Sequence, residues 1–161
     1  MDPVVCRDTL DKLIAEESGT LDQLQQLLDR EHELLVANDV DGLEKTGQAR
    51  QTCVGVLMRI EDDRRALCRA LNVPADKHGL DRILAWCDPD KALRRRWADC
   101  AERADRCRAA NDRNGALVTA RLNRVQGMLD VVTGRAGQPK VYGRQGAFET
   151  QPRAARVLAS V

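Results

Sequence analysis

The sequence is poor in aromatic residues and has no long apolar run. Its 161 residues include two tryptophans, one tyrosine and one phenylalanine. So few large rings argue against an aromatic-rich β-sandwich or β-barrel. No apolar run approaches the ~18 residues that a bilayer-spanning helix needs, and the first residues lack the basic and apolar segments of a signal peptide. We therefore expect a cytoplasmic protein without stable membrane insertion.

The charges nearly cancel, with 26 Lys and Arg against 25 Asp and Glu, while 43% of the residues are hydrophobic. This composition is too apolar for a wholly disordered chain and too charged for a membrane protein. A compact domain of about 150 residues buries roughly two-thirds of the surface that its unfolded chain exposes. We therefore expect one domain with a modest core, built almost entirely from aliphatic side chains.

Motifs for metal, redox or catalytic chemistry are missing. The six cysteines include no CxxC pair, and they lie on or beside apolar positions, so we interpret them as small reduced core residues. The two histidines, His32 and His78, belong to no metal-binding or nucleophile motif. Glu61-Asp62-Asp63 would fan around a helix axis and hold a metal poorly. We expect a protein that is not an enzyme and holds no metal or cofactor.

Apolar residues three and four positions apart predict three long helices. The first runs from the N-terminus to Asn38, begins at either Asp2-Pro3 or Asp8, and continues through Gly19. Asp41 is predicted to cap the second helix, which ends before Asn72-Val73-Pro74. The short connection makes these two helices antiparallel neighbours.

The second half of the chain predicts a short helix and then the third long one. The short helix precedes Asp88-Pro89, and the long helix begins there and runs to Val132. Asn114-Gly115 would ordinarily indicate a turn. The apolar spacing keeps its phase across this pair, however, so we predict a continuous helix with a soft point at Gly115.

The predicted fold is therefore all-α: an elongated antiparallel helical bundle or coiled coil of three long helices plus one short helix. Residues 1–133 would form this bundle. Residues 134–161 contain repeated Gly and Pro without apolar periodicity, which predicts a flexible C-terminal tail.

The charge is distributed unevenly along the chain. Residues 1–38 carry a net charge of −6, whereas residues 76–133 carry +3. This asymmetry favours ion pairs between the first and the third long helix. Arginines on the third helix, among them Arg94, Arg103 and Arg113, could instead bind phosphates. Because acidic residues alternate with them and Trp97 is a lone aromatic residue among them, we expect no nucleic-acid partner.

A broad apolar face covers the last part of the third long helix. It comprises Leu117, Val118, Leu122, Val125, Met128, Leu129 and Val132. This face is wider than one coiled-coil contact requires. It could simply close the bundle, or it could receive an amphipathic helix of another protein, with Met128 adapting to its shape. The residues alone leave both interpretations open.

Three motifs in a fixed order resemble the FlgN family of flagellar export chaperones. They are Leu93-Arg-Arg-Arg-Trp97, Asn111-Asp-Arg-Asn114-Gly115-Ala-Leu117-Val118, and Val141-Tyr142-Gly143-Arg-Gln-Gly146. The family has a Trp near the start of its last long helix, an Asn-Gly within that helix, and a Tyr-Gly-x-x-Gly after it. The specific likeness covers about residues 93–146.

The resemblance implies a cytoplasmic chaperone that binds the C-terminal segments of the hook-filament junction proteins FlgK and FlgL and delivers them to the flagellar type III export gate. By analogy, the helix from Asn114 to Val132, with the apolar face just described, would bind cargo. Tyr142, with Gly143, would dock on the gate protein FlhA. The residues alone favour a different interpretation, in which Tyr142 is an ordinary tail residue packed back on the bundle. A self-associating coiled-coil scaffold or adaptor remains the alternative function, and the oligomeric state is open.

Overall fold

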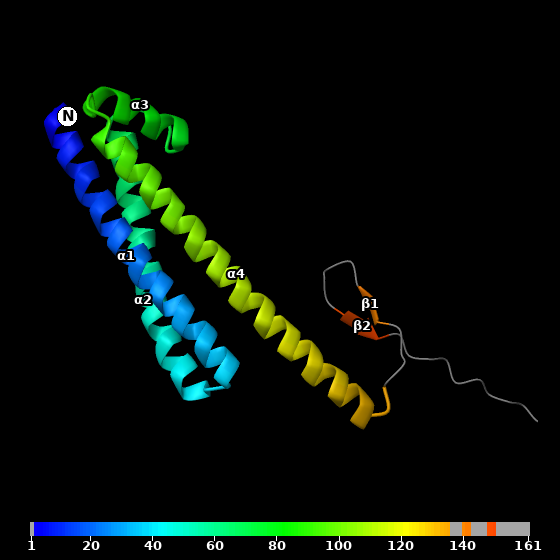
Figure 1. Cartoon of the computed structure of the whole chain (residues 1–161). Helices are drawn as coiled ribbons and strands as arrows, with labels where there is room; N and C mark the ends of the chain where they lie inside the picture. Colours follow the sequence, from blue (N-terminus) through cyan, green and yellow to red (C-terminus); the bar gives the residue numbers. More distant parts are fainter. Residues whose placement is uncertain (1, 136–139, 143–147, 151–161) are drawn as a thin grey trace, which may run out of the picture. The chain divides into compact units, whose positions relative to one another are not determined.

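The computed structural model of the chain describes residues 2–135, 140–142 and 148–150. Its elements are α1 (Pro3–Ala37), α2 (Val40–Ala70), α3 (Lys77–Cys87), α4 (Ala92–Val132), β1 (Lys140–Tyr142) and β2 (Phe148–Thr150) (Figure 1). The prediction of an all-α fold with three long helices and one short helix is confirmed. The chain divides into two compact units, residues 1–118 and residues 119–161, which are described separately.

In the first unit, α1 and α2 lie side by side and run antiparallel, as the short connection between them predicted (Figure 1). A first core cluster joins the start of α1 to the end of α2, α3 and the start of α4. Its members are Cys6, Leu10, Ile14, Leu67, Cys68, Leu80, Ile83, Leu84, Cys87 and Leu93. The short helix α3 therefore closes one end of the bundle with aliphatic and thiol side chains.

A second core cluster joins α1 to α4 further along the bundle. Leu21 and Leu28 of α1 pack against Cys100, Cys107 and Ala110 of α4. All six cysteines of the chain are buried and free, which confirms that they are small core residues. Asn111, the first residue of the Asn-Gly motif, is exposed, whereas the preceding Ala110 is buried.

The first helix begins at one of the two starts that the sequence left open, and it ends at the predicted residue. Asp2 is the N-cap, and its carboxylate accepts a hydrogen bond from the backbone N–H of Val4, which decides for Asp2-Pro3 over Asp8. Asn38 ends the helix in the left-handed conformation with a φ of 59°. The helix is continuous through Gly19, as predicted.

Two other helix starts were predicted wrongly. The N-cap of α2 is Asp39, whose carboxylate accepts from the N–H of Gly42 at 2.9 Å, and Asp41 lies inside the helix. The fourth helix begins at Ala92 instead of at Asp88-Pro89. Asp88 ends α3 and begins a turn, and its buried carboxylate accepts from the backbone N–H of Arg94 at 2.9 Å. This aspartate therefore still satisfies a helix N–H, across a turn that local sequence rules do not reveal.

The second unit contains the end of α4 and two short strands. β1 and β2 pair antiparallel, with Lys140 opposite Thr150 and Tyr142 opposite Phe148. These strands were not predicted, because Gly and Pro dominate the local pattern. The predicted division between residues 133 and 134, and the flexibility of the tail, stay predictions.

Candidate functional site

The predicted cargo-binding residues on α4 lie at exposed positions, with two exceptions. Val118 is 40% exposed, and Leu122, Val125, Met128, Leu129 and Val132 are each more than half exposed. Leu117 is half-buried, and Asn114 is buried. We call the seven apolar residues Leu117, Val118, Leu122, Val125, Met128, Leu129 and Val132 the apolar stripe. Large aliphatic side chains without cover are costly in water, so their concentration on one helix requires an explanation.

The stripe has a centre and a flank. Val118, Leu122, Val125, Leu129 and Val132 follow one another at spacings of four, three, four and three, which places them on one side of the helix. Met128 and Leu117 lie beside this line. Val131 is also exposed, but its position in the helical repeat places it on nearly the opposite side. Sequence reasoning omitted Val131, and its place outside the stripe makes it useful as a control.

The predicted site residue Asn114 differs from the other seven. Its Nδ2 donates to the backbone oxygen of Leu28 at 2.8 Å and to Glu31 Oε2 at 3.0 Å. Its Oδ1 lies 3.1 Å from His32 Nδ1. The side chain is thus held by α1 within the first unit, and only 3% of the residue is exposed.

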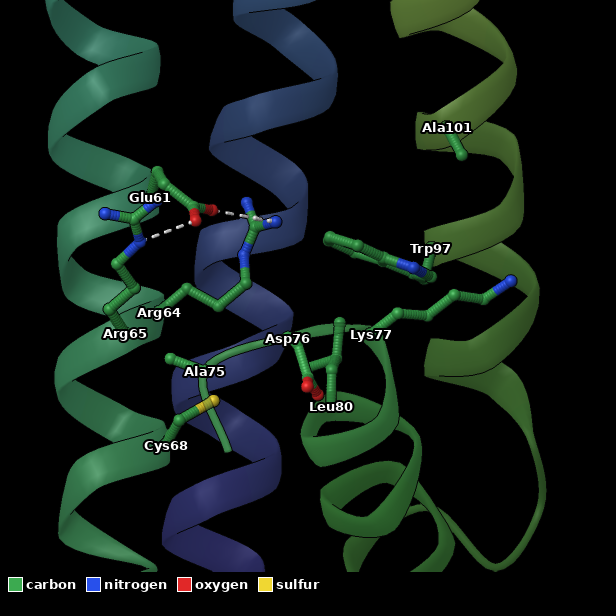
Figure 2. A pocket seen from close by; sticks show the side chains of 10 residues that line it. All are labelled: Glu61, Arg64, Arg65, Cys68, Ala75, Asp76, Lys77, Leu80, Trp97 and Ala101. Carbon is green, nitrogen blue, oxygen red and sulfur yellow. Dashed lines mark hydrogen bonds and ion pairs between the residues drawn. The ribbon is translucent and has the colours of Figure 1, made fainter. Parts of the chain in front are cut away.

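A pocket of about 370 Å³ lies between α2, the start of α3 and α4 (Figure 2). Its lining includes Trp97, which the sequence analysis singled out, together with Arg64, Cys68, Lys77 and Leu80. The guanidinium carbon of Arg64 lies 4.4 Å from the centre of the Trp97 ring. Sequence reasoning missed the pocket, because it forms only where three helices converge.

The charged groups around this pocket are mostly engaged with one another. Arg64 bonds to Glu17 of α1 at 2.7 Å. Arg64 and Arg65 also pair with Glu61, at 3.4 Å and 2.9 Å (Figure 2). Burial raises the pKa of the Cys68 thiol, which disfavours the reactive thiolate. In the part of the chain that the structure describes, no group of three His, Cys, Asp or Glu side chains could hold a metal. The pocket therefore offers shape and a cation–π contact, but no reactive group.

The arginines of α4 form the ion pairs with α1 that the charge distribution predicted. Arg96 pairs with Asp11, Arg103 pairs with Asp22, and the guanidinium of Arg113 lies 3.0 Å from Asp29. Hydrogen bonds from Gln25 and Arg113 lower the pKa of Asp29. These arginines serve contacts between helices, which weakens the interpretation of α4 as a phosphate-binding surface.

The predicted gate-docking residues fall at the edge of what the structure describes. Tyr142 is the last residue of β1, opposite Phe148 of β2. Gly143 lies outside the described residues. Across the described helices, no segment is both long and apolar enough to cross a membrane.

Comparison with known proteins identifies the family. The sequence model of the FlgN protein family matches residues 4–150. A crystal structure of a proposed flagella synthesis protein FlgN from Pseudomonas aeruginosa is similar, with a TM-score of 0.63 and 32% sequence identity. The similarity covers 68% of this chain and 86% of that protein's chain. No curated protein matched the sequence. Because the family model spans most of the chain and agrees with the helical fold, this protein belongs to the FlgN family.

Proposed function

We propose that this protein is a cytoplasmic export chaperone of flagellum assembly. In this proposal the apolar stripe of α4 binds the amphipathic C-terminal segments of FlgK and FlgL, and the segment at Tyr142 and Gly143 docks on the export gate protein FlhA. Membership of the FlgN family and the similarity to the P. aeruginosa protein support the role in flagellum assembly. The named partners come from the resemblance to the family.

The exposure of the stripe is the observation that carries the cargo-binding proposal. Five aliphatic side chains and one methionine on the last part of α4 are 40% to 84% exposed. Burying apolar surface stabilises a complex by about 25 cal/mol per Å², from which the costs of association and ordering are subtracted. An amphipathic helix laid along the stripe would cover these side chains, and its own apolar face would be shielded from self-association.

Asn114 has a different role in this proposal from that of the seven stripe residues. Its amide is already engaged by Leu28 and Glu31, so a bound cargo helix could not reach it without breaking those bonds. We therefore propose that cargo contacts begin at Leu117 and Val118. Asn114 would contribute by holding α4 in place.

The spacing of the stripe also favours a second candidate, self-association as a coiled-coil scaffold. Val118, Leu122, Val125, Leu129 and Val132 have the alternating spacing of a heptad repeat, although it extends over little more than two heptads. Sedimentation over a wide range of concentrations distinguishes the two candidates. Oligomerisation through α4 in the absence of cargo would favour the scaffold.

Calorimetric titration with the C-terminal segments of FlgK and FlgL from the same organism tests the cargo-binding proposal. We expect saturable binding with a negative change in heat capacity, because apolar surface leaves water. A folded, helical sample that binds neither segment would contradict the proposal.

The gate-docking proposal has a separate test. We expect Tyr142→Ala to weaken binding to the cytoplasmic domain of FlhA about tenfold or more, since an aromatic anchor at an interface often contributes over 1 kcal/mol. The affinity for the cargo segments should stay at the wild-type value. Unchanged FlhA binding in this variant would show that Tyr142 does not form the contact.

A further inference from the structure

A small, largely buried polar network connects three helices of the first unit. Asn114 of α4 donates to the Leu28 carbonyl and to Glu31 of α1, and Glu31 also accepts from Arg50 of α2 at 3.0 Å. His32 lies 3.1 Å from Asn114 Oδ1. One buried amide therefore links α4 directly to α1, and through Glu31 to α2.

Within the second core cluster, the apolar contacts between α1 and α4 discriminate weakly between registers, and the solvent-accessible pairs of α4 arginines with Asp11, Asp22 and Asp29 each contribute little. The α4 side consists of small residues, Cys100, Cys107 and Ala110, packed against Leu21 and Leu28. The two helices run parallel here, since Cys107 contacts the backbone oxygen of Leu21 and Asn114, seven residues later, contacts that of Leu28 (Figure 1). Leu21 and Leu28 are seven residues apart, and so are Cys100 and Cys107. A shift of α4 by one heptad would thus again place a cysteine against a leucine.

Asn114 breaks this repeat. After a shift of α4 by seven residues along α1, the Asn114 amide would no longer lie beside the Leu28 carbonyl and Glu31. In one direction of the shift, a cysteine of α4 would occupy the position beside Leu28 instead. A buried amide without hydrogen-bond partners is costly, and a single buried asparagine can specify the register of packed helices. The shifted arrangement would therefore lose the contact that Asn114 makes in the observed one.

We propose that Asn114 is a positioning residue that fixes the register of α4 on α1. This register determines which residues of α4 are covered by α1. It therefore also determines that the exposed part of the stripe begins at Val118. This proposal does not depend on the identity of the cargo. Loss of cargo binding and loss of register can be measured separately.

The test uses Asn114→Leu and the two tryptophans as reporters. Trp97 lies on α4 against Arg64 of α2, so a shift of α4 changes its surroundings, whereas Trp86 lies on α3. Trp97 is about 25 Å along the helix from residue 114, too far for a local effect of the substitution. We expect a second Trp97 indole N–H resonance in the NMR spectrum of the ¹⁵N-labelled full chain, because the population of the shifted register rises to about 10% or more. Trp86 should keep one unchanged resonance.

Two further variants make the result decisive. Asn111→Leu introduces the same change at an exposed position three residues earlier and should leave one Trp97 resonance. Asn114→Ala removes the amide with a residue type that the interface already contains, so it serves if Asn114→Leu fails to fold. A folded Asn114 variant with a single Trp97 resonance at the wild-type position overturns the proposal, even if its stability has fallen.

Discussion

The two halves of α4 use apolar residues in opposite ways. From Leu93 to Asn114, the buried positions hold mostly small side chains, and neighbouring arginines pair with aspartates of α1. From Leu117 to Val132, the side chains are larger, yet most of them are exposed. Small residues let two helices approach closely, whereas large exposed residues supply area for a contact not yet made. Apolar residues of one helix are thus packed within the fold in one half and exposed in the other half, which we propose for binding.

The largest expected effect contrasts the same substitution in both halves. Leu93→Ala removes a side chain that is 2% exposed in the first core cluster, so we expect the free energy of unfolding to fall by about 2–5 kcal/mol. Leu122→Ala changes a residue that is 64% exposed and should alter it by less than about 0.5 kcal/mol. Chemical denaturation measures both. Equal losses in the two variants would mean that the stripe is part of the core.

The next effect concerns binding instead of folding. Leu122→Asp combined with Met128→Asp places two charges on the stripe, and we expect the affinity for the cargo segments to fall about 100-fold or more. Helical circular dichroism should remain close to that of the wild type, because both positions are exposed.

A matched double variant controls for added charge. Ala120→Asp with Val131→Asp introduces the same two carboxylates on nearly the opposite side of the same helical segment, at exposed positions. It should bind cargo within about threefold of the wild type, since surface changes away from a contact have small effects. If the stripe variant unfolds while this control stays folded, the stripe closes the fold and the binding proposal is wrong.

The smallest effect is a dependence of stability on alkaline pH, which arises in the first unit. Burial raises the pKa of Cys6 to about 12, and it also raises the pKa values of Cys100 and Cys107 on the packed half of α4. Above pH 9 the unfolded thiols lose protons that the folded thiols keep. Stability therefore falls as pH rises, by about 1 kcal/mol at pH 10 for Cys6, and the ionisation of Cys100 and Cys107 in the unfolded state adds to this loss.

Denaturation at pH 8 and pH 10 measures this loss. Replacing Cys100 and Cys107 with Ala should reduce the difference between the two pH values, since two of the ionising groups are removed. Replacing exposed Ala120 with Ser, on the other half of α4, should leave it unchanged. A pH dependence that is identical in all three proteins would show that the α4 thiols do not contribute.

Much of the fold could be predicted because helix signals are local. The spacing of leucines, the Asp2-Pro3 start and the left-handed Asn38 all depend on neighbouring residues. The start of α4 was predicted wrongly because Asp88 bonds to Arg94 across a turn that includes Lys91 with a φ of 58°. Such a turn is stabilised by contacts that lie beyond the reach of local capping rules.

The candidate site was less predictable than the fold. The exposed residues of the stripe were identified from their spacing, but Asn114 was grouped with them although α1 holds its side chain. The pocket at Trp97 was missed, because its walls come from three different helices, with lining residues that extend from Glu61 to Ala101. Contacts of this kind leave no periodic signal.

The sequence by itself determined the number of helices, their phase and the apolar side of each one, because these follow from side chains three and four positions apart. Only the tertiary structure decided which apolar positions are covered. Leu93 and Leu122 have the same side chain on the same helix, yet one is buried and the other exposed. The physical reason is that the periodicity of apolar residues identifies a helix face whose burial is favourable. This periodicity is the same whether the face is buried by this chain or by a partner.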